Sequence, residues 1–327
     1  QSERSERVKT IASLIVKNLN QSKLLDAVML ASDLSKADLS SNMVGEFPEL
    51  QGIMGRYYAL NEKISDEVAF AIEDHYKPRF SGDSLPRSTV GDIVAIADKI
   101  ETLIGLFSIG EKPTGDKDPF ALRRQVIGII RILTEKNIGL NLNTVISESI
   151  QATKLVESKD LNSFIYDRLS NFFKDQGYAA LDIEAVLAIE SGLINEIPAR
   201  LNAIKEFLLL PESEDLASAN KRVGNILKKA DVKSSLKVNQ SLLKDEAEIN
   251  LFNTLDFVDA ESRKEYMEKN YSGSLKLLCK LKNPIDQFFK DVMVNAEDES
   301  LKMNRLALLE KLYSAMNLVA DLSKLSS

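Results

Sequence analysis

Apolar residues recur along almost the whole chain at the spacing of an amphipathic α-helix. In RVKTIASLIVKNL they place Val8, Ile11, Leu14, Ile15 and Leu19 on one stripe, because intervals of three and four residues return to the same helix face. The segments DIVAIADKIETLIGLF and LKMNRLALLEKLYSAMNLVADL repeat this pattern. Alternation with a period of two, the pattern of a strand, is scarce. The sequence therefore predicts an all-α fold.

Proline and glycine mark the breaks between the predicted helices. Two polar segments rich in both residues, 77–92 and 109–119, are expected to be loops. Pro48 is expected to be the first residue of a helix. Asp118 and Pro119 are expected to cap and begin another helix, with Asp118 as the N-cap and Pro119 as the first helical residue.

Two glycines interrupt the segment FPELQGIMGRYYAL, which otherwise has a helical pattern. Gly52 and Gly55 would each lower the stability of a helix by about 1 kcal/mol relative to alanine. We therefore expect another part of the backbone to pack closely against them.

Polar connections divide the predicted helices into three parts. We expect a first domain over residues 1–135, a helical connector over residues 136–205 and a C-terminal helical bundle over residues 206–327. The segment LLLPESEDLASAN begins the bundle.

Composition narrows the functional classes. The chain has 327 residues, of which 44% are hydrophobic and 28% charged, as in ordinary globular proteins. With 49 acidic and 42 basic residues the net charge is −7, which excludes a chain coated with nucleic-acid-binding charge but allows a local basic face. No apolar run approaches the ~20 residues of a membrane-spanning helix.

Two residue types occur only once each. Cys279 is the single cysteine, so a disulfide within the chain and a zinc site built from cysteines are excluded. We expect Cys279 to be a thiol in the core. His75 is the single histidine, which excludes a metal site with two histidines. We expect His75 to be a surface residue or a hydrogen-bonded structural residue.

Five basic side chains gather in one segment of this acidic chain. They are Lys112, Lys117, Arg123, Arg124 and Arg131. Free N–H groups at a helix start attract phosphate, and arginine can bind two phosphate oxygens at once, so this segment could contact RNA. The arginines could instead pair with acidic residues on neighbouring helices. The segment PTGDK lacks the G-x-x-x-x-G-K-[ST] spacing of an ATP-binding loop.

A second basic helix is predicted in the segment SANKRVGNILKKA. Its basic residues are Lys221, Arg222, Lys228 and Lys229. Asn220 and Asn225 could hydrogen-bond to nucleic acid or to the backbone. The basic residues could contact RNA, or they could form a solvated helix face.

Four acidic residues lie close together in the sequence and are separated by apolar residues. They are Asp33, Asp38, Glu46 and Glu49. Paired carboxylates could hold a metal ion, or they could serve as helix caps and surface charges.

Five long segments stand out in order along the chain: SKADLSSNMVGEFPELQGIMGRYYAL, HYKPRFSGDSLP, IADKIETLIGLFSIGEKPTGDKDPFALRR, ANKRVGNILKK and DVMVNAEDESLKMNRLALLEKL. Together they resemble the β subunit of bacterial-type glycyl-tRNA synthetase. The resemblance covers nearly the whole chain and implies that it is about the C-terminal half of that subunit. In that family the α subunit holds the site for ATP, glycine and adenylate formation. The β subunit binds tRNA and is needed for charging.

The resemblance also implies an architecture. Residues 1–135 would form an HD-like helical domain, and residues 206–327 an anticodon-binding bundle similar to that of arginyl-tRNA synthetase. HD phosphohydrolases hold metal with histidines and aspartates. Here VAIADKIETL supplies Asp98 and SKADL at most Asp38, while the histidines are missing. We therefore expect this domain to be metal-free and to hydrolyse no phosphate ester.

Two rival interpretations stay open. One is a metal-dependent HD-type phosphohydrolase with an unusual acidic site at Asp38 and Asp98. The other is a non-catalytic helical scaffold that docks other parts of the subunit.

The resemblance implies that the chain is the tRNA-binding part of a glycine–tRNA ligase and lacks its catalytic site. Its expected partners are tRNA(Gly), the α subunit and the missing N-terminal part of β, with neither DNA nor a membrane. No cofactor is expected in this part, because ATP and Mg²⁺ serve the α subunit. The expected location is a bacterial cytoplasm, or an organelle if the source is a eukaryote. The expected RNA contacts are the basic residues Lys112, Lys117, Arg123, Arg124, Arg131, Lys221, Arg222, Lys228 and Lys229.

Overall fold

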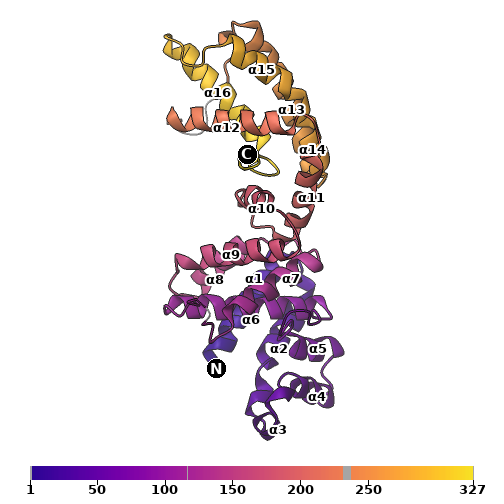
Figure 1. The fold of residues 1–327 in the computed structure, drawn as a ribbon. Helices are drawn as coiled ribbons and strands as arrows, with labels where there is room; N and C mark the ends of the chain where they lie inside the picture. Colours follow the sequence, from indigo (N-terminus) through magenta and orange to yellow (C-terminus); the bar gives the residue numbers. More distant parts are fainter. Residues whose placement is uncertain (1, 116, 231–236, 327) are drawn as a thin grey trace. The chain divides into compact units, whose positions relative to one another are not determined.

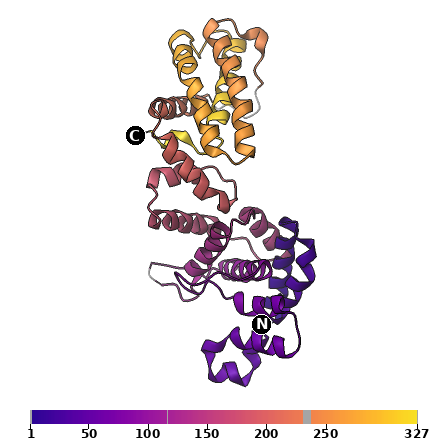
Figure 2. The same ribbon diagram turned by 90° about the vertical axis from the view of Figure 1, so that its right-hand side faces the viewer.

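The computed structural model describes residues 2–115, 117–230 and 237–326. Within these ranges the regular elements are α-helices and short 3-10 helices, and the β-structure is limited to isolated bridges. The prediction of an all-α fold is confirmed. Among the described helices, none is both long and apolar enough to cross a membrane. Figures 1 and 2 show the helices in two views.

The chain divides into two compact units. Unit 1 comprises residues 1–172 and 191–196, and unit 2 comprises residues 173–190 and 197–327. The first change from one unit to the other falls inside α9 (Asp160–Asp175). This division does not test the three domains expected from the sequence, which stay a prediction.

Unit 1 is built around one buried helix. Its helices are α1 (Ser2–Asn18), α2 (Leu25–Leu34), α3 (Asn42–Glu46), α4 (Ile53–Asn61), α5 (Asp66–Asp74), α6 (Thr89–Ser108), α7 (Leu122–Glu135), α8 (Leu142–Thr153) and most of α9. Helix α6 packs against α1, α2, α5 and α7 (Figure 1). Because it is covered on several sides, α6 is apolar over most of its circumference rather than along one stripe.

Unit 2 is a second helical bundle. Its helices are α10 (Ala180–Leu187), α11 (Ile197–Phe207), α12 (Ser213–Lys229), α13 (Glu246–Met267), α14 (Tyr271–Leu277), α15 (Lys282–Asp291) and α16 (Glu299–Met316). Helix α13 packs against α14, α15 and α16, and α12 packs against α16 and the 3-10 helix at Leu322–Lys324. Helix α12 therefore buries one side in the bundle and leaves the other side to solvent.

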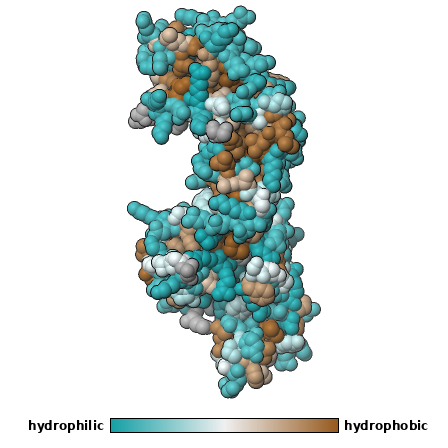
Figure 3. Space-filling view, in the orientation of Figure 1, coloured by the Kyte–Doolittle hydropathy of each residue, from teal (hydrophilic) through white to brown (hydrophobic). Residues whose placement is uncertain are grey.

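The surface is polar with scattered apolar residues. On the face shown in Figure 3, hydrophilic side chains cover most of the chain and apolar ones emerge in patches. The most exposed large apolar side chains are Leu209 at 84% and Met267 at 79%. Exposed apolar residues that stand singly are normal in globular proteins, so exposure alone identifies no interface here.

The two predicted helix starts have different outcomes. Pro48 begins a 3-10 helix, Pro48–Leu50, so its position as a first helical residue is confirmed. The prediction that a helix begins at Pro119 is wrong, because Ala121 has a φ of 55° and α7 begins only at Leu122. Asp118 still caps this helix, since its carboxylate accepts hydrogen bonds from the N–H groups at the start of α7, at 2.8 and 3.0 Å.

The two glycines of α4 surround a buried carboxylate. Gly52 has a φ of 82°, which favours glycine, and precedes the helix. Its N–H group donates to Oδ2 of Asp38 at 2.6 Å, and that of Gly55 donates to the same oxygen at 3.1 Å. A Cβ atom on Gly55 would lie 2.7 Å from Cγ2 of Ile72. Close packing at these glycines is confirmed, but the nearest neighbours are side chains rather than backbone.

We expect Asp38→Ala to destabilise unit 1. The substitution leaves the N–H groups of Gly52 and Gly55 without their buried acceptor, which lowers the free energy of unfolding by about 2–3 kcal/mol. Urea unfolding followed by circular dichroism measures this loss. Asp33→Ala is the matched control, because Asp33 is exposed and its removal leaves no buried group unpaired. Equal urea midpoints for the two variants would contradict this role of Asp38.

Candidate nucleic-acid interface

The loop before α7 is tied together by its own backbone and by two basic side chains. The backbone groups of Thr114 and Lys117 exchange two hydrogen bonds, at 3.1 and 2.9 Å. Arg123 donates from its guanidinium to the carbonyl of Gly115. Lys112 pairs with Asp160 of α9 at 2.6 Å. These contacts constrain the described residues of the loop, and two predicted RNA contacts, Lys112 and Arg123, already have partners within the protein.

The other three predicted contacts of this segment differ in availability. Arg131 is largely buried, and its guanidinium binds the Glu135 carboxylate at 2.6 Å and the Asp83 carbonyl at 2.9 Å. Lys117 and Arg124 are exposed, and their side chains have no ion pair within the described parts of the chain. These two are the cations of this segment that are free to bind an anion.

Helix α12 carries the second basic group on its exposed side. Lys221, Arg222, Lys228 and Lys229 are all exposed. None of them forms an ion pair with another described residue. Two cations in the last turn, Lys228 and Lys229, also lie at the negative end of the helix dipole.

A shallow groove of about 410 Å³ lies between α12 and α15. The guanidinium of Arg222 stacks over the ring of Phe289 at 3.9 Å from its centre. Lys290 lines the same groove, together with the acidic residues Asp215 and Asp286. The stacked pair places the positive charge of Arg222, an exposed residue, over the ring of the partly buried Phe289.

The asparagines of α12 have separate roles. Asn220 is buried, and its side chain exchanges two hydrogen bonds with that of Asn317, at 2.8 and 3.1 Å. It joins α12 to the end of α16 and does not face solvent. Asn225 is exposed. The suggestion that Asn220 contacts nucleic acid is therefore wrong.

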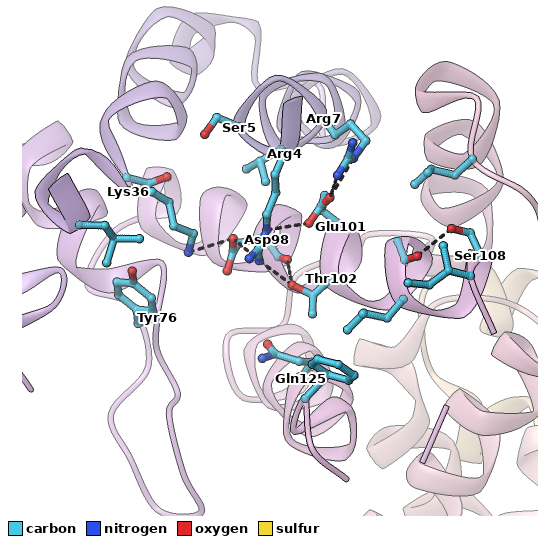
Figure 4. A pocket seen from close by; sticks show the side chains of 18 of the residues that line it. Arg4, Ser5, Arg7, Lys36, Tyr76, Asp98, Glu101, Thr102, Ser108 and Gln125 are labelled. Atoms are coloured by element: carbon cyan, nitrogen blue, oxygen red, sulfur yellow. Dashed lines mark hydrogen bonds and ion pairs between the residues drawn. The ribbon is translucent and has the colours of Figure 1, made fainter. Parts of the chain in front are cut away.

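A separate cluster of charges lies in unit 1 around Asp98 of α6 (Figure 4). The Asp98 carboxylate accepts ion pairs from Lys36 and Arg4, both at 3.1 Å. Burial alone would raise the pKa of Asp98, but the positive charges of Lys36 and Arg4 lower it to about 2. One helix turn further, Glu101 binds Arg4 and Arg7, both at 2.8 Å.

His75 lies behind this cluster and is completely buried. Its Nε2 atom is 2.8 Å from the ammonium of Lys36, and its Nδ1 atom is 2.6 Å from the carbonyl oxygen of Ile72. An ammonium only donates, so Nε2 accepts and Nδ1 carries the proton. Burial, with the charge of Lys36, holds the pKa of His75 well below its usual 6.5. This geometry supports the interpretation of His75 as a hydrogen-bonded structural residue.

The acidic residues singled out in the sequence are not assembled into a metal site. Asp38 is bound by two backbone N–H groups, and Asp98 is neutralised by Lys36 and Arg4. Across residues 2–115, 117–230 and 237–326, no group of three or more His, Cys, Asp or Glu side chains could hold a metal ion. The hydrolase interpretation is not favoured by this arrangement.

The sequence patterns did not indicate the roles of three residues in this charge cluster. Arg4, Arg7 and Lys36 occupy positions whose importance depends on helices far apart in the sequence. The one available signal was Lys36, which stands two residues before Asp38, in the segment whose carboxylates could either hold a metal ion or serve as caps and surface charges. Cys279 also differs from expectation, because it is half-buried rather than in the core.

Comparisons with known proteins match both units. A family model described as glycyl-tRNA synthetase beta subunit matches residues 1–188. A second model, described as DALR anticodon binding domain, matches residues 216–322, which begin within α12.

Curated relatives cover the whole chain. The glycine–tRNA ligase beta subunits of Methylobacillus flagellatus and Nitrosomonas europaea are 53% and 48% identical to it over 332 and 345 residues. That of Delftia acidovorans is 49% identical over 330 residues. Each alignment includes 100% of this chain but only 47% or 48% of the relative. The chain therefore spans about half the length of the curated relatives it matches.

The helical fold and these matches place the chain in the class of aminoacyl-tRNA synthetase proteins. More specifically, the chain belongs to the family of glycyl-tRNA synthetase beta subunits.

We expect the imidazole of His75 to stay neutral in the folded protein between pH 7.5 and 5.5. The only histidine gives a single set of imidazole NMR signals, and these should not shift over this range because burial disfavours the charged ring. Signals that titrate near pH 6.5 would contradict the buried, lysine-bound geometry.

The same shift affects stability in a defined direction. The unfolded chain binds a proton at His75 near pH 6.5 and the folded chain does not, so this group lowers stability as the pH falls below 6.5, by at most about 1.4 kcal/mol per pH unit. Asp92 acts in the opposite direction, because burial raises its pKa to about 6 and the folded chain gains its proton first. The imidazole NMR signals report on His75 alone, whereas the pH dependence of stability combines the effects of His75 and Asp92.

Proposed function

We propose that this chain is the tRNA-binding portion of a glycyl-tRNA synthetase β subunit and positions tRNA(Gly) for glycylation at the α subunit. One observation carries the proposal. Helix α12 lies at the start of the region that matches the anticodon-binding model, and it holds four exposed basic side chains on the side that the bundle leaves uncovered. A helix packed on one side and basic on the other is suited to contact a phosphate backbone.

Unit 1 supplies a second contact in this proposal. Lys117 and Arg124 are exposed and unpaired within the described residues, and the loop that carries Lys117 is held by hydrogen bonds. The hydrogen bonds order the backbone near Lys117 in advance, although the exposed side chains still lose rotamer freedom when they bind. Phosphate contacts of this kind fix the register of the RNA and carry no sequence information by themselves.

The other parts of the enzyme would supply the chemistry. In this proposal the α subunit binds ATP, Mg²⁺ and glycine, and this chain forms no aminoacyl-adenylate on its own and holds no cofactor. Its partners are tRNA(Gly), the α subunit and the rest of β. Because the matched relatives are bacterial, we place it in the bacterial cytoplasm, or in an organelle of bacterial descent.

We expect two charge-removing double variants to weaken tRNA binding. Lys117→Ala with Arg124→Ala, and Lys221→Ala with Lys228→Ala, each remove two exposed cations without breaking an ion pair of the described residues. If each pair contacts two phosphates, each variant should reduce the slope of log K against log salt by about 1.5, and weaken binding roughly tenfold near 0.1 M salt. Fluorescence anisotropy with a tRNA(Gly) transcript across a salt series measures both quantities.

The matched control is Lys23→Ala with Lys63→Ala, which removes the same charge from exposed sites outside both basic groups. Its affinity and salt slope should remain close to those of the unmodified chain. A non-cognate tRNA provides the specificity control. If the unmodified chain binds neither tRNA at low salt, the proposed function is wrong and a scaffold role is favoured. If only one double variant weakens binding, the RNA contact lies on that unit alone.

A further inference from the structure

Unit 1 contains a pocket of about 830 Å³ that none of the predicted RNA contacts lines. Figure 4 shows it from close by, with Arg4 and Arg7 extending from α1 toward Asp98 and Glu101 of α6, and Gln125 of α7 lying across from them. Small-molecule sites in proteins occupy about 300–1,000 Å³, so the pocket has room for one nucleotide-sized group.

One side of the pocket is polar and pre-organised. Glu101 holds the guanidinium groups of both Arg4 and Arg7 at 2.8 Å, and Arg4 is held further by Asp98 and Thr102. Both arginines remain partly exposed, with 40% and 29% of their side chains accessible. In the described residues their Nη1 atoms have no hydrogen-bond partner. Both guanidinium groups are therefore held in place, while their Nη1 groups remain free to donate hydrogen bonds.

The charge of the lining favours an anion. Its cations are Arg4, Arg7 and Lys36, and its anions are Asp98 and Glu101, so the balance is 3 − 2 = +1. Because each carboxylate already accepts from these cations, the remaining potential belongs to the exposed guanidinium edges. A phosphate bound there would receive hydrogen bonds from planar, fixed donors, the arrangement that binds phosphate well.

The other side of the pocket is apolar and aromatic. Phe120, just before α7, lines it and is 46% exposed. Ile109 lines it and is 72% exposed, and Leu106 and Leu155 lie beside them. The amide of Gln125 is also part of the lining and has no hydrogen-bond partner within the described chain. An aromatic face next to a free amide can stack on a nucleobase and hydrogen-bond to its edge.

From this combination we infer that the pocket binds one unpaired nucleotide of an RNA, with its base against Phe120 and Gln125 and its phosphate on Arg4 and Arg7. That this RNA is a tRNA rests on the proposed function.

The test compares two double variants of this chain in binding to a tRNA(Gly) transcript. Phe120→Ala with Gln125→Ala removes the stacking face and the free amide without touching the charge network, and should weaken binding about tenfold. The control, Phe47→Ala with Gln151→Ala, removes an equally exposed phenylalanine and an exposed glutamine that do not line the pocket. It should leave the affinity unchanged. Circular dichroism confirms that both variants are folded.

A photo-crosslinking arm locates the nucleotide. Benzoylphenylalanine replaces the phenylalanine at position 120, and the crosslinked tRNA position is read by primer extension. The expected product is a single unpaired nucleotide, with no crosslink from the same substitution at position 47. A third arm adds AMP as competitor, to distinguish a nucleotide within RNA from a free one. Displacement of tRNA only at millimolar AMP fits the RNA ligand.

The remaining outcomes each overturn a defined statement. If the unmodified chain binds tRNA but the Phe120→Ala, Gln125→Ala variant binds it equally well, or if benzoylphenylalanine at position 120 crosslinks only to paired nucleotides, the pocket inference is wrong and the proposed function stands. If AMP binds at micromolar concentration and the pocket variant keeps full tRNA affinity, the pocket belongs to a free nucleotide. If the unmodified chain binds no tRNA, the proposed function fails, and the pocket loses its RNA ligand with it.

Discussion

The organisation of unit 1 depends on how the buried carboxylate of Asp98 is neutralised. A charge in the interior is tolerated only when it is paired and hydrogen-bonded. Here the partners come from two other parts of the chain, with Arg4 from α1 and Lys36 from the residues after α2. His75, at the end of α5, then accepts from Lys36 and fixes it. One carboxylate thus specifies how three segments meet α6, because loss of any partner would leave a buried charge exposed to an apolar interior.

The same constraint links the core to the surface. Glu101 lies one turn beyond Asp98 on α6 and shares Arg4 with it, so the internal charge balance also fixes the guanidinium edges that line the pocket. An arginine on a free surface would lose side-chain entropy on binding an anion. Arg4 and Arg7 have already lost most of that freedom in the folded protein, because buried carboxylates hold them. A pre-organised donor of this kind binds more tightly than a mobile one with the same charge.

Periodicity predicted the helices because each amphipathic stripe reports burial of one face, and a residue such as Ile11 or Ile15 needs no knowledge of its partners. The start of α7 was less predictable, since the left-handed conformation of Ala121 is not favoured by alanine and follows from the surrounding loop. The pocket was least predictable. Arg4 and Glu101 are 97 residues apart, and no local pattern indicates that they meet. Sequence patterns found the exposed basic groups of α7 and α12, but only the structure separates Arg124, which is unpaired, from Arg131, which is bound internally.

The charge distribution of the chain makes its unpaired cations significant. The chain has 49 acidic and 42 basic residues. Because acidic residues are in excess, most exposed cations would be expected to find an acidic partner. Lys282 pairs with Asp215, and Lys311 with Asp256, as this excess would suggest. Lys221 and Lys228 on α12 have no such partner among the described residues although the same unit supplies acids. Cations that form no ion pair contribute a local positive field on a negative protein. Such a field attracts a polyanion to one face and repels it from the others, so under the proposed function the net negative charge would help to orient the RNA rather than oppose its binding.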